Sequence, residues 1–362
     1  IWNDALGRVT AGEEVAEVTR DMARQAELAH LRESEPDRVE VRHPGKAFIF
    51  VLMLLLGGAV ALTSGSRERG LQAGRPHGPR LGLFALPALL IFSIFFAYPS
   101  IAALAAAAVE WDGLTPPRFV GALNIERLLL ESDLFWTSLG NNLFLMAVPA
   151  VVVIPLSLLL ASLLHREVVG AKLFRVAFFF PNLLGVAGVV LWQQLYNPTI
   201  GPVNRILVGL GFHRFEGFAW LSEEYLYYAL VPMAVWSAAG FNMVLFLAAM
   251  QAVPQSLYES AELMGAGEWQ KFRYITLPLI RDTLAVATVL MIIGGMKAFE
   301  AIWLLTNQQP SSQTHVVGTY MIRSLFVEQR IGQAAALATL LFLVVLVGSL
   351  LGNRALEQED LG

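Results

Sequence analysis

The sequence predicts an all-α integral membrane protein. Of its 362 residues 56% are hydrophobic, against about 45–50% in soluble proteins, and only 15% are charged. Its mean hydropathy is +0.58. Six apolar segments are long enough to cross a bilayer as helices. They are residues 81–108, 138–164, 174–196, 228–252, 283–305 and 333–351.

A seventh apolar run, residues 47–62, is shorter than the others. Its 16 residues would form a helix of about 24 Å, whereas the hydrocarbon core is about 30 Å thick. We expect an extra N-terminal hydrophobic helix here, either spanning the membrane or lying in its interface. The two alternatives put residues 1–46 on opposite sides of the membrane. A basic linker, residues 63–80, follows.

Residues 1–46 form a polar segment unlike the rest of the chain. Thr10 and Glu13 have the spacing of a capping box, which predicts a short amphipathic helix over about 11–31. Because the first residue is Ile1, we expect a processed form or a fragment of a longer protein. The chain then divides into this segment, residues 47–80, a transmembrane domain at 81–351 and a C-terminal tail at 352–362.

Composition excludes several functions. The net charge of −4 gives no general attraction to nucleic acid. There are no cysteines, and the six histidines are scattered without an i, i+4 pair, so no metal site is predicted. The only Gly-Lys pair, Gly45-Lys46, lacks the other residues of a phosphate-binding loop. We therefore predict no enzymatic activity and no bound cofactor in this chain.

A polar island at residues 258–278 separates two of the apolar segments. Pro254 opens a helical turn before it, and Gly265 and Gly267 interrupt it in the middle. Apolar residues recur at helical spacing on both sides of the glycines. They are Leu257, Ala261 and Met264 before them and Trp269, Phe272 and Ile275 after them. The pattern predicts two short amphipathic helices around a glycine hinge at a membrane surface.

Lys and Arg are unequally distributed between alternate loops. The set containing residues 253–282 and the C-terminus has eleven, and the other set has six. The positive-inside rule places the set with more Lys and Arg in the cytoplasm. We therefore expect the polar island and the C-terminus to be cytoplasmic.

The polar island resembles the cytoplasmic coupling loop, or EAA motif, of permease subunits of ABC importers. The matching residues are Glu259-Ser260-Ala261, Gly265-Ala266, Phe272, Ile275 and Leu277-Pro278. Ser260 stands where the family has alanine, and Met264 stands where carbohydrate-type members often have aspartate. We call residues 254–280 the coupling loop.

Other residues between 81 and 351 extend the resemblance to the carbohydrate branch, which includes maltose and glycerol-phosphate permeases. Glu300 replaces a commoner aspartate, and Asn307-Gln308-Gln309 replaces a glycine pair. The matching residues are Phe119-Val120-Gly121, Asn124, Phe135-Trp136, Asn141-Asn142, Phe174-Arg175, Phe180-Pro181, Trp192, Asn197-Pro198, Gly201, Asn204, Gly240-Phe241-Asn242, Leu247-Ala248, Gln251, Lys297, Phe299-Glu300, Leu305-Thr306, Pro310 and Thr314.

The resemblance implies the six-helix core of a type I ABC importer in a bacterial inner membrane. It also implies a second permease, two cytoplasmic subunits that bind ATP and Mg²⁺, an extracytoplasmic solute-binding protein and contact with membrane lipid. The coupling residues would be Glu259 as a charge contact, Gly265 as a hinge and Phe272 as an apolar anchor, together with Ala261, Ala266 and Pro278.

Polar residues inside the apolar segments are candidates for the substrate path, because each costs free energy in lipid unless it faces protein or water. Lys297 and Glu300 share a helix face and can pair, either in the path or as a brace. Asn242 either lines a cavity or bonds a neighbouring helix. Trp192 and Gln193, with Gln194, suit a carbohydrate, although Trp192 could instead anchor its helix at the interface.

Two other classes remain open on the sequence alone. A secondary transporter would need intramembrane carboxylates for ion coupling, and Glu300 is the clear candidate. A membrane-bound enzyme would need a catalytic cluster, which the sequence does not suggest. Among substrates, the lack of an arginine cluster in the apolar segments favours a neutral sugar over a phosphate ester.

Overall fold

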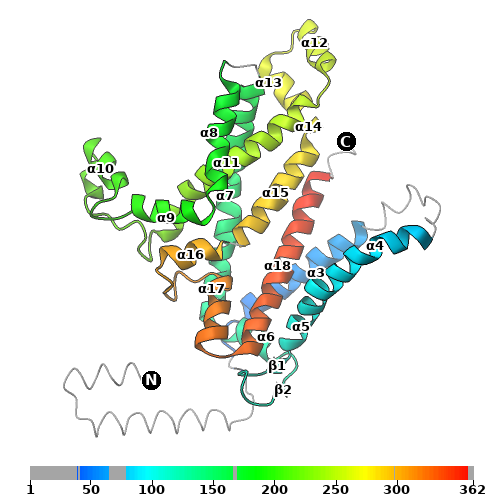
Figure 1. The fold of residues 1–362 in the computed structure, drawn as a ribbon, viewed down its shortest axis with the longest axis vertical. Coiled ribbons are helices and arrows are strands. Elements are labelled where there is room, and N and C mark those ends of the chain that lie inside the picture. Colours follow the sequence, from blue (N-terminus) through cyan, green and yellow to red (C-terminus); the bar gives the residue numbers. More distant parts are fainter. Residues whose placement is uncertain (1–38, 40, 65–78, 166–168, 297, 358–362) are drawn as a thin grey trace. The chain divides into compact units, whose positions relative to one another are not determined.

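The structure is a computed structural model that describes residues 39, 41–64, 79–165, 169–296 and 298–357 (Figure 1). Contacts within the chain divide it into two units, Ile1–Arg42 and His43–Gly362, and the elements below belong to the second. The amphipathic helix expected at 11–31, most of the basic linker and Lys297 lie outside the described residues.

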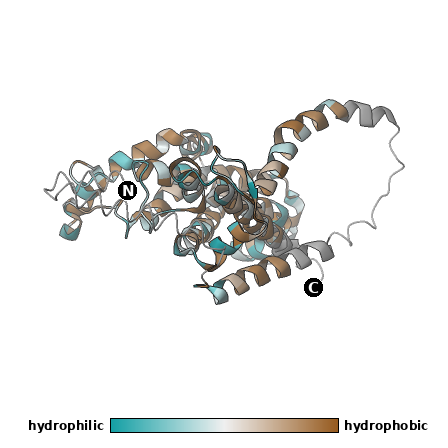
Figure 2. Ribbon diagram, turned by 90° about the horizontal axis from the view of Figure 1, so that it is seen from below, coloured by the Kyte–Doolittle hydropathy of each residue, from teal (hydrophilic) through white to brown (hydrophobic). Residues whose placement is uncertain are grey.

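The apolar segments predicted from the sequence are helical. Within the described residues, five helices are long and apolar enough to cross a membrane, and Figure 2 shows hydrophobic, brown residues recurring along the helices. They are Leu86–Ala106, formed by α4 (Pro79–Phe92), the π turn η2 (Ser93–Ala97) and α5 (Tyr98–Ala106); α7 (Asp133–His165); α11 (Leu226–Gln251); Arg281–Leu305, formed by α15 (Arg281–Met296) and α16 (Phe299–Leu305); and α18 (Ile331–Glu357).

The remaining expected segment, residues 174–196, is broken. It forms α8 (Ala171–Leu183) and α9 (Val186–Leu195), whose axes differ by 92°. Gly185 lies at the break with φ +50° and ψ −124°, a conformation that residues with a side chain rarely adopt. In Figure 1, α9 turns away from the direction of α8. Taken as one broken span, the pair brings the number of apolar spans to six, the number predicted for the core.

Short elements connect these helices. Most are one or two turns long, and the strand pair is antiparallel. They are β1 (Val109–Glu110), β2 (Arg118–Phe119), α6 (Leu123–Leu130), α10 (Pro202–Gly209), the 3-10 turn η3 (His213–Phe215), α12 (Gln255–Leu263), α13 (Glu268–Lys271), the π turn η4 (Phe272–Thr276), α14 (Leu277–Leu279), α17 (Val317–Ile322) and the π turn η5 (Arg323–Val327).

The extra N-terminal hydrophobic helix is present as α3 (Pro44–Ser64). It packs against α18 and α6. Phe50 meets the rings of Phe135 and Trp136 edge-on, with centroids 6.2 and 5.9 Å away. His43 Nε2 lies 2.8 Å from Asp133 Oδ1 at the start of α7. Aromatic and polar contacts therefore attach α3 to the start of the helical core.

The helix α7 runs through all three apolar clusters of the core. It contributes Phe135 and Leu139 to the first cluster, which includes α18 residues. Leu145 belongs to a second cluster with the start of α11 and with α16. Ala161 and Leu164 belong to the third, with the end of α11 and with α15. Because one helix joins all three clusters, a shift at either end of α7 is transmitted through packed side chains.

Two helix crossings depend on glycine. A Cβ at Gly240 of α11 would lie 1.8 Å from the carbonyl oxygen of Phe178 in α8. A Cβ at Gly295 of α15 would lie 2.7 Å from the carbonyl oxygen of Leu145 in α7. Small residues let helix backbones approach closely in membrane proteins. These glycines therefore set the distances between α11 and α8 and between α15 and α7.

Candidate functional site

The coupling loop folds as the sequence predicts, into two short helices separated by a glycine turn. The helix α12 ends at Leu263, and Gly265 follows with φ +81°. The Ala266 N–H donates to the Ala261 carbonyl and the Gly265 N–H donates to the Glu262 carbonyl, both at 2.9 Å. This pair of bonds is a Schellman motif, which favours glycine at the residue with positive φ.

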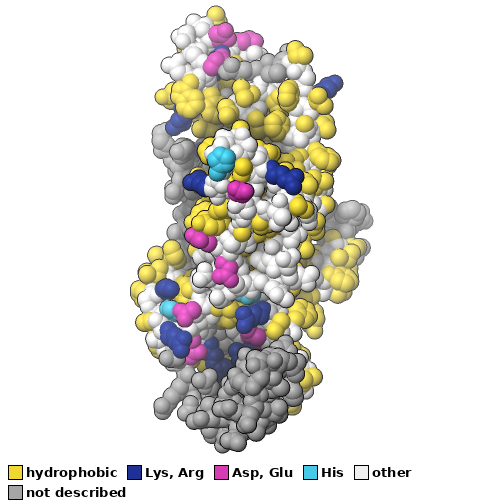
Figure 3. Space-filling view, turned by 90° about the vertical axis from the view of Figure 1, so that its left-hand side faces the viewer, with side chains coloured by type: hydrophobic (Ala, Val, Ile, Leu, Met, Phe, Trp, Pro, Cys, Tyr) yellow, Lys and Arg dark blue, Asp and Glu magenta, His cyan; other side chains and the backbone are white. Residues whose placement is uncertain are grey.

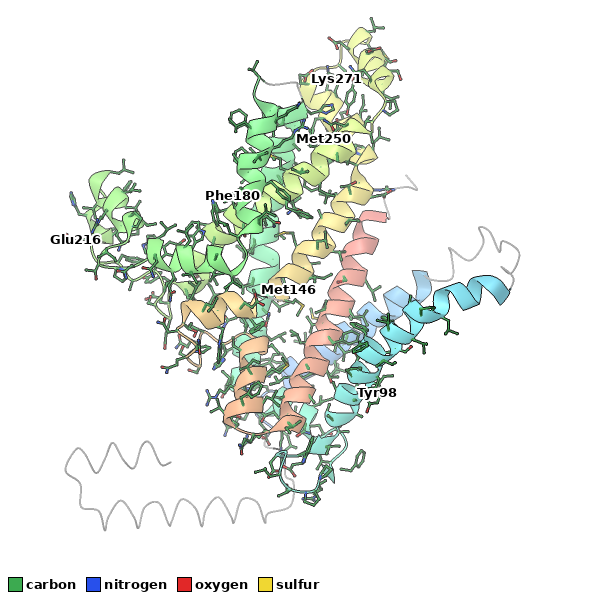
Figure 4. The ribbon with its side chains drawn as sticks, in the orientation of Figure 1. Tyr98, Met146, Phe180, Glu216, Met250 and Lys271 are labelled. Atoms are coloured by element: carbon green, nitrogen blue, oxygen red, sulfur yellow. The ribbon has the colours of Figure 1, made fainter. Side chains whose placement is uncertain are left out.

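After the turn, α13 continues without a gap through η4 into α14. The Gly267 N–H donates to Gln270 Oε1 at 2.8 Å, which satisfies one backbone donor at the start of α13. Lys271 bonds Glu268, and its Nζ lies 3.6 Å from Glu262 Oε2 on α12. The bond to Glu268 raises the pKa of Lys271. Figure 4 shows Lys271 where α12 and α13 meet.

The apolar residues of the coupling loop divide into a buried base and an exposed tip. Ala261 is buried, and Phe272 packs against the third cluster beside Met250 and Ile280. By contrast, Leu263 is 91% exposed and Met264 is 82% exposed. Figure 3 shows acidic and hydrophobic side chains together at this end of the molecule. The tip therefore presents apolar side chains that this chain does not cover.

One expectation for α12 needs correction. The sequence predicts one apolar face for Leu257, Ala261 and Met264, but only Ala261 is buried. Met264 is the residue that follows the last helical turn, so its side chain leaves the helical repeat. Trp269 of the second stripe is 70% exposed and stacks on Phe272 with centroids 5.7 Å apart. Of the other predicted coupling residues, Glu259 and Pro278 are exposed and Ala266 is half-buried.

The predicted substrate-path residues fall in two places. Trp192 and Gln193 lie on α9, which packs against α16, the helix that carries Glu300. Gln193 Nε2 donates to Asn307 Oδ1 at 3.1 Å, just after α16. Glu300 is exposed, and its predicted partner Lys297 lies outside the described residues. Trp192 and Gln193 therefore lie near the C-terminal end of α9, beside α16.

Trp192 is part of a run of aromatic side chains. Its ring lies 5.9 Å from Trp236 and 5.1 Å from Tyr196, and Tyr196 continues to Trp220 at 5.6 Å. The Trp192 indole N–H is buried and has no acceptor among the described residues. The ring is thus packed between α9 and α11.

Asn242 lies apart from that group. It is 2% exposed, and its Nδ2 donates to the Ala238 carbonyl at 2.9 Å and lies 3.7 Å from the Met291 sulfur on α15. Its Oδ1 is buried without a donor among the described residues. The bond to Ala238 stays within α11, and the contact with the Met291 sulfur is the one that reaches a neighbouring helix, α15.

Sequence reasoning missed a buried polar group that fixes the loop before α17. Asn141 Nδ2 donates to the carbonyls of Gln313 and His315, each at 2.8 Å. Asn142 Oδ1 accepts from the Val317 N–H at 2.8 Å. His315 is 1% exposed, with Nδ1 3.0 Å from Thr319 Oγ1. The Asn141-Asn142 pair was the available signal, and nothing in the sequence distinguishes His315 from the other histidines.

The described residues contain no group of three or more His, Asp or Glu side chains that could hold a metal ion. The candidate functional features in the described chain are the coupling loop and the polar and aromatic residues near the C-terminal end of α9 and on α16.

Comparison with known proteins identifies relatives of similar length. A probable ABC transporter permease of Pyrococcus horikoshii is 33% identical over 276 residues, which cover 75% of this chain and 94% of that protein. The diacetylchitobiose uptake permease of Streptomyces coelicolor is 33% identical over 302 residues, covering 77% and 85%. The arabinooligosaccharides transport permease of Bacillus subtilis is 32% identical over 276 residues, covering 74% and 86%.

A solved structure has the same fold. In the crystal structure of a bacterial ABC transporter that imports the acidic polysaccharide alginate, one chain superposes with a TM-score of 0.66 and 27% identity, covering 77% of this chain and 96% of that chain. The family of binding-protein-dependent transport system inner membrane components matches residues 134–358. This match includes the coupling loop and five of the six core segments, and the chain belongs to that family of ABC-importer permeases.

Proposed function

We propose that this permease carries a neutral oligosaccharide and that the coupling loop transmits the movement of ATP-hydrolysing partners to its helices. Importers of this family contain a second permease, ATP-binding subunits and a solute-binding protein. ATP and Mg²⁺ would bind those subunits, and ATP hydrolysis would draw on their residues alone. The permease would then alternate between inward-open and outward-open states.

The exposed tip of the coupling loop carries this proposal. Leu263, Met264 and Trp269 are apolar and largely exposed. They lie on either side of the glycine turn that connects α12 to α13. Exposed apolar side chains beside acidic ones suit an interface with another protein. Phe272 packs against the cluster that joins α7, α11 and α15. A displacement of the tip by a partner would therefore be passed to three core helices. Glu259 would supply a charge contact there.

The substrate class rests on two observations. Relatives of this chain are named for diacetylchitobiose and for arabinooligosaccharides. In this chain, Trp192 and Gln193 place an aromatic ring and an amide beside α16, and such groups suit the C–H faces and hydroxyls of a sugar. We propose that Trp192, Gln193 and Glu300 contribute to the substrate path, together with Lys297. Asn242 would support the path by holding α11 to α15.

We also propose the arrangement of the chain in the membrane. Residues 81–351 would form the permease domain, preceded by the polar segment 1–46 and the hydrophobic helix and linker 47–80 and followed by the tail 352–362. The coupling loop and the C-terminus would be cytoplasmic, because their set of loops has more Lys and Arg.

The test is a detergent pull-down of the tagged chain from its native membrane, with mass spectrometry of the proteins that accompany it. We expect a second permease, an ATP-binding subunit and a solute-binding protein, and the purified binding protein should bind a neutral oligosaccharide. A binding protein that prefers an acidic or phosphorylated sugar would overturn the substrate class. A stable chain without any ATP-binding subunit, whose uptake collapses with an ionophore, would favour an ion-driven transporter.

A further inference from the structure

Tyr258 joins three elements at the base of the coupling loop. Its hydroxyl lies 2.9 Å from Thr276 Oγ1, which connects α12 to η4 across 18 residues of sequence. Its ring centroid lies 6.2 Å from that of His165, the last residue of α7. Thr276 is 6% exposed and Tyr258 is half-buried. The hydroxyl pair is therefore partly shielded from water, which strengthens a hydrogen bond.

Two further features join α12 to the second half of the loop, the turn at Gly265 and an ion pair. The turn at Gly265 is the covalent connection, and glycine gives it little resistance to bending. The ion pair between Lys271 and Glu262 also joins the two halves, but the Glu262 side chain is 73% exposed. An ion pair in water contributes little stability. The shielded bond between Tyr258 and Thr276 is thus the specific attachment at the base.

The position of Thr276 gives this attachment a mechanical consequence. It is the last residue of η4, whose turn closes with a bond from the Leu277 N–H to the Phe272 carbonyl. Phe272, at the other end of η4, packs against the cluster of α7, α11 and α15. A force on α12 that passes through Tyr258 therefore arrives at a segment packed into the core, four residues before Ile280, which is buried in the same cluster.

We infer that Tyr258 and Thr276 form a clasp that makes α12 and η4 move as one body, so that displacement of the loop tip reaches α7 and α15. This inference rests on the proposed role of the loop in coupling. Tyr258 and Thr276 act as positioning residues: neither is assigned a contact with substrate or ATP. Without the clasp, α12 would turn more freely about Gly265, and less of the tip's displacement would reach η4 and the core helices.

The first experiment measures the clasp in the full chain reconstituted in nanodiscs. Because the chain has no cysteine, Leu263→Cys with Tyr274→Cys places two spin labels on opposite sides of the turn at exposed positions. We expect one narrow distance distribution in this background. Adding Tyr258→Phe, which keeps the ring beside His165, should broaden it, and Thr276→Val should do the same. Thr276→Ser, which keeps the hydroxyl, should restore a narrow distribution. An unchanged distribution with Tyr258→Phe would overturn the clasp.

The second experiment measures transport in the importer purified with its partners and reconstituted in proteoliposomes. Tyr258→Phe should retain the ATP-binding subunit and hydrolyse ATP, while substrate taken up per ATP falls about two- to tenfold, the range expected from losing one hydrogen bond. In the double variant with Thr276→Val, substrate uptake per ATP should be no lower than in either single variant, because both substitutions remove the same hydrogen bond.

The outcomes separate the two proposals. Normal uptake per ATP with Tyr258→Phe, in an importer that retains its ATP-binding subunit, would overturn the clasp and leave the proposed function intact. If the unmodified chain retains no ATP-binding subunit, the proposed function fails. The spin-label distances then show by themselves whether Tyr258 and Thr276 hold α12 and η4 together.

Discussion

Gly265 has a backbone conformation that determines which residues its position accepts. A Cβ there would meet nothing within 4 Å in this chain, so the constraint is the φ of +81° and not crowding. A residue with a side chain pays about 1 kcal/mol or more to adopt a left-handed conformation. Because this chain leaves the space around Gly265 open, an added side chain there would obstruct a partner protein and not this chain.

Gly265→Asp should leave the permease inserted and lower ATP-dependent uptake at least several-fold, because the turn is strained and a charge is added at the tip. Uptake in membrane vesicles, normalised to inserted protein, measures the effect. The matched control is Gly211→Asp, which changes a glycine of similar φ, +95°, that also has open space around it, but in the segment between α10 and η3. An equal loss of uptake in both variants would show that the effect of Gly265→Asp does not depend on its place in the coupling loop.

His315 should make the stability of this permease sensitive to acid. Burial, and to a smaller extent the charge of Arg323, lowers the pKa of His315 from its usual 6.5 to about 4. Between these values the unfolded chain binds the proton more readily than the folded chain, so stability falls as the pH drops from about 6.5 to 4. The loss at pH 5 is about 2 kcal/mol.

The measurement is the thermal unfolding midpoint in detergent between pH 7.5 and pH 5, for the unmodified chain and for His315→Gln. The variant should lose less of its midpoint on acidification, whatever its value at pH 7.5. Parallel pH profiles would contradict a buried neutral histidine.

Residues inside a strong local pattern could be predicted, and residues paired across the fold could not. The glycines and apolar spacing of the coupling loop were sufficient to predict its two helices. Tyr258 and Thr276 are 18 residues apart, a spacing that belongs to no helical repeat, so their contact depends on the angle of the turn. Likewise, Asn141 and Asn142 of α7 bond the backbone of His315 and Val317, which are more than 170 residues away in sequence.

Among the elements, α8 and α11 cross with their backbones in direct contact at a glycine. The Phe178 carbonyl occupies the space where a side chain at Gly240 would begin. Beside it, Ser157 Oγ of α7 donates to the Ala239 carbonyl at 3.0 Å. Three helices therefore meet at one level with no room for an added methyl group.

Gly240→Ala should destabilise the permease by about 3 kcal/mol, because α8 must move to accept the methyl group. Gly140→Ala is the control: Gly140 lies in α7 with nothing within 4 Å, and alanine is the better helix former. Thermal unfolding of both variants in the same detergent compares them. A midpoint for Gly240→Ala equal to that of Gly140→Ala would show that the crossing is looser than described.

The break between α8 and α9 shows what hydropathy alone does not resolve. Residues 174–196 form one apolar run, and their average hydropathy contains no sign of a 92° bend. The physical signal was Gly185, which can adopt a backbone conformation closed to other residues, yet a glycine inside an apolar helix is also common in membrane proteins. The number of spans could therefore be predicted, and the shape of this one could not.

For the molecule as a whole, the two ends of the helical core should lie on opposite sides of the membrane. Figure 1 shows α12 and the β1 and β2 pair at opposite ends of α7 and α18. Because the chain has no cysteine, single cysteines report on each end without background. Leu263 in the coupling loop and Leu114 between the strands are both more than 80% exposed.

A maleimide that cannot cross membranes should label Leu114→Cys in spheroplasts and Leu263→Cys in inside-out vesicles. The reason is the larger number of Lys and Arg residues in the coupling-loop set, which should keep that set in the cytoplasm. Labelling of Leu263→Cys in intact spheroplasts would invert the proposed topology and place the loop beyond the reach of an ATP-hydrolysing partner.

The π turns η2, η4 and η5 each hold one residue more than a turn of α-helix, so each takes up an extra residue without ending its helix. In η4 the Leu277 N–H reaches back five residues to the Phe272 carbonyl. If such a turn relaxed to regular α-helix, the residues on one side of it would have to rotate by about 100° about the helix axis. The π turn at 272–276 therefore sets which face the first part of the coupling loop presents relative to α14 and α15.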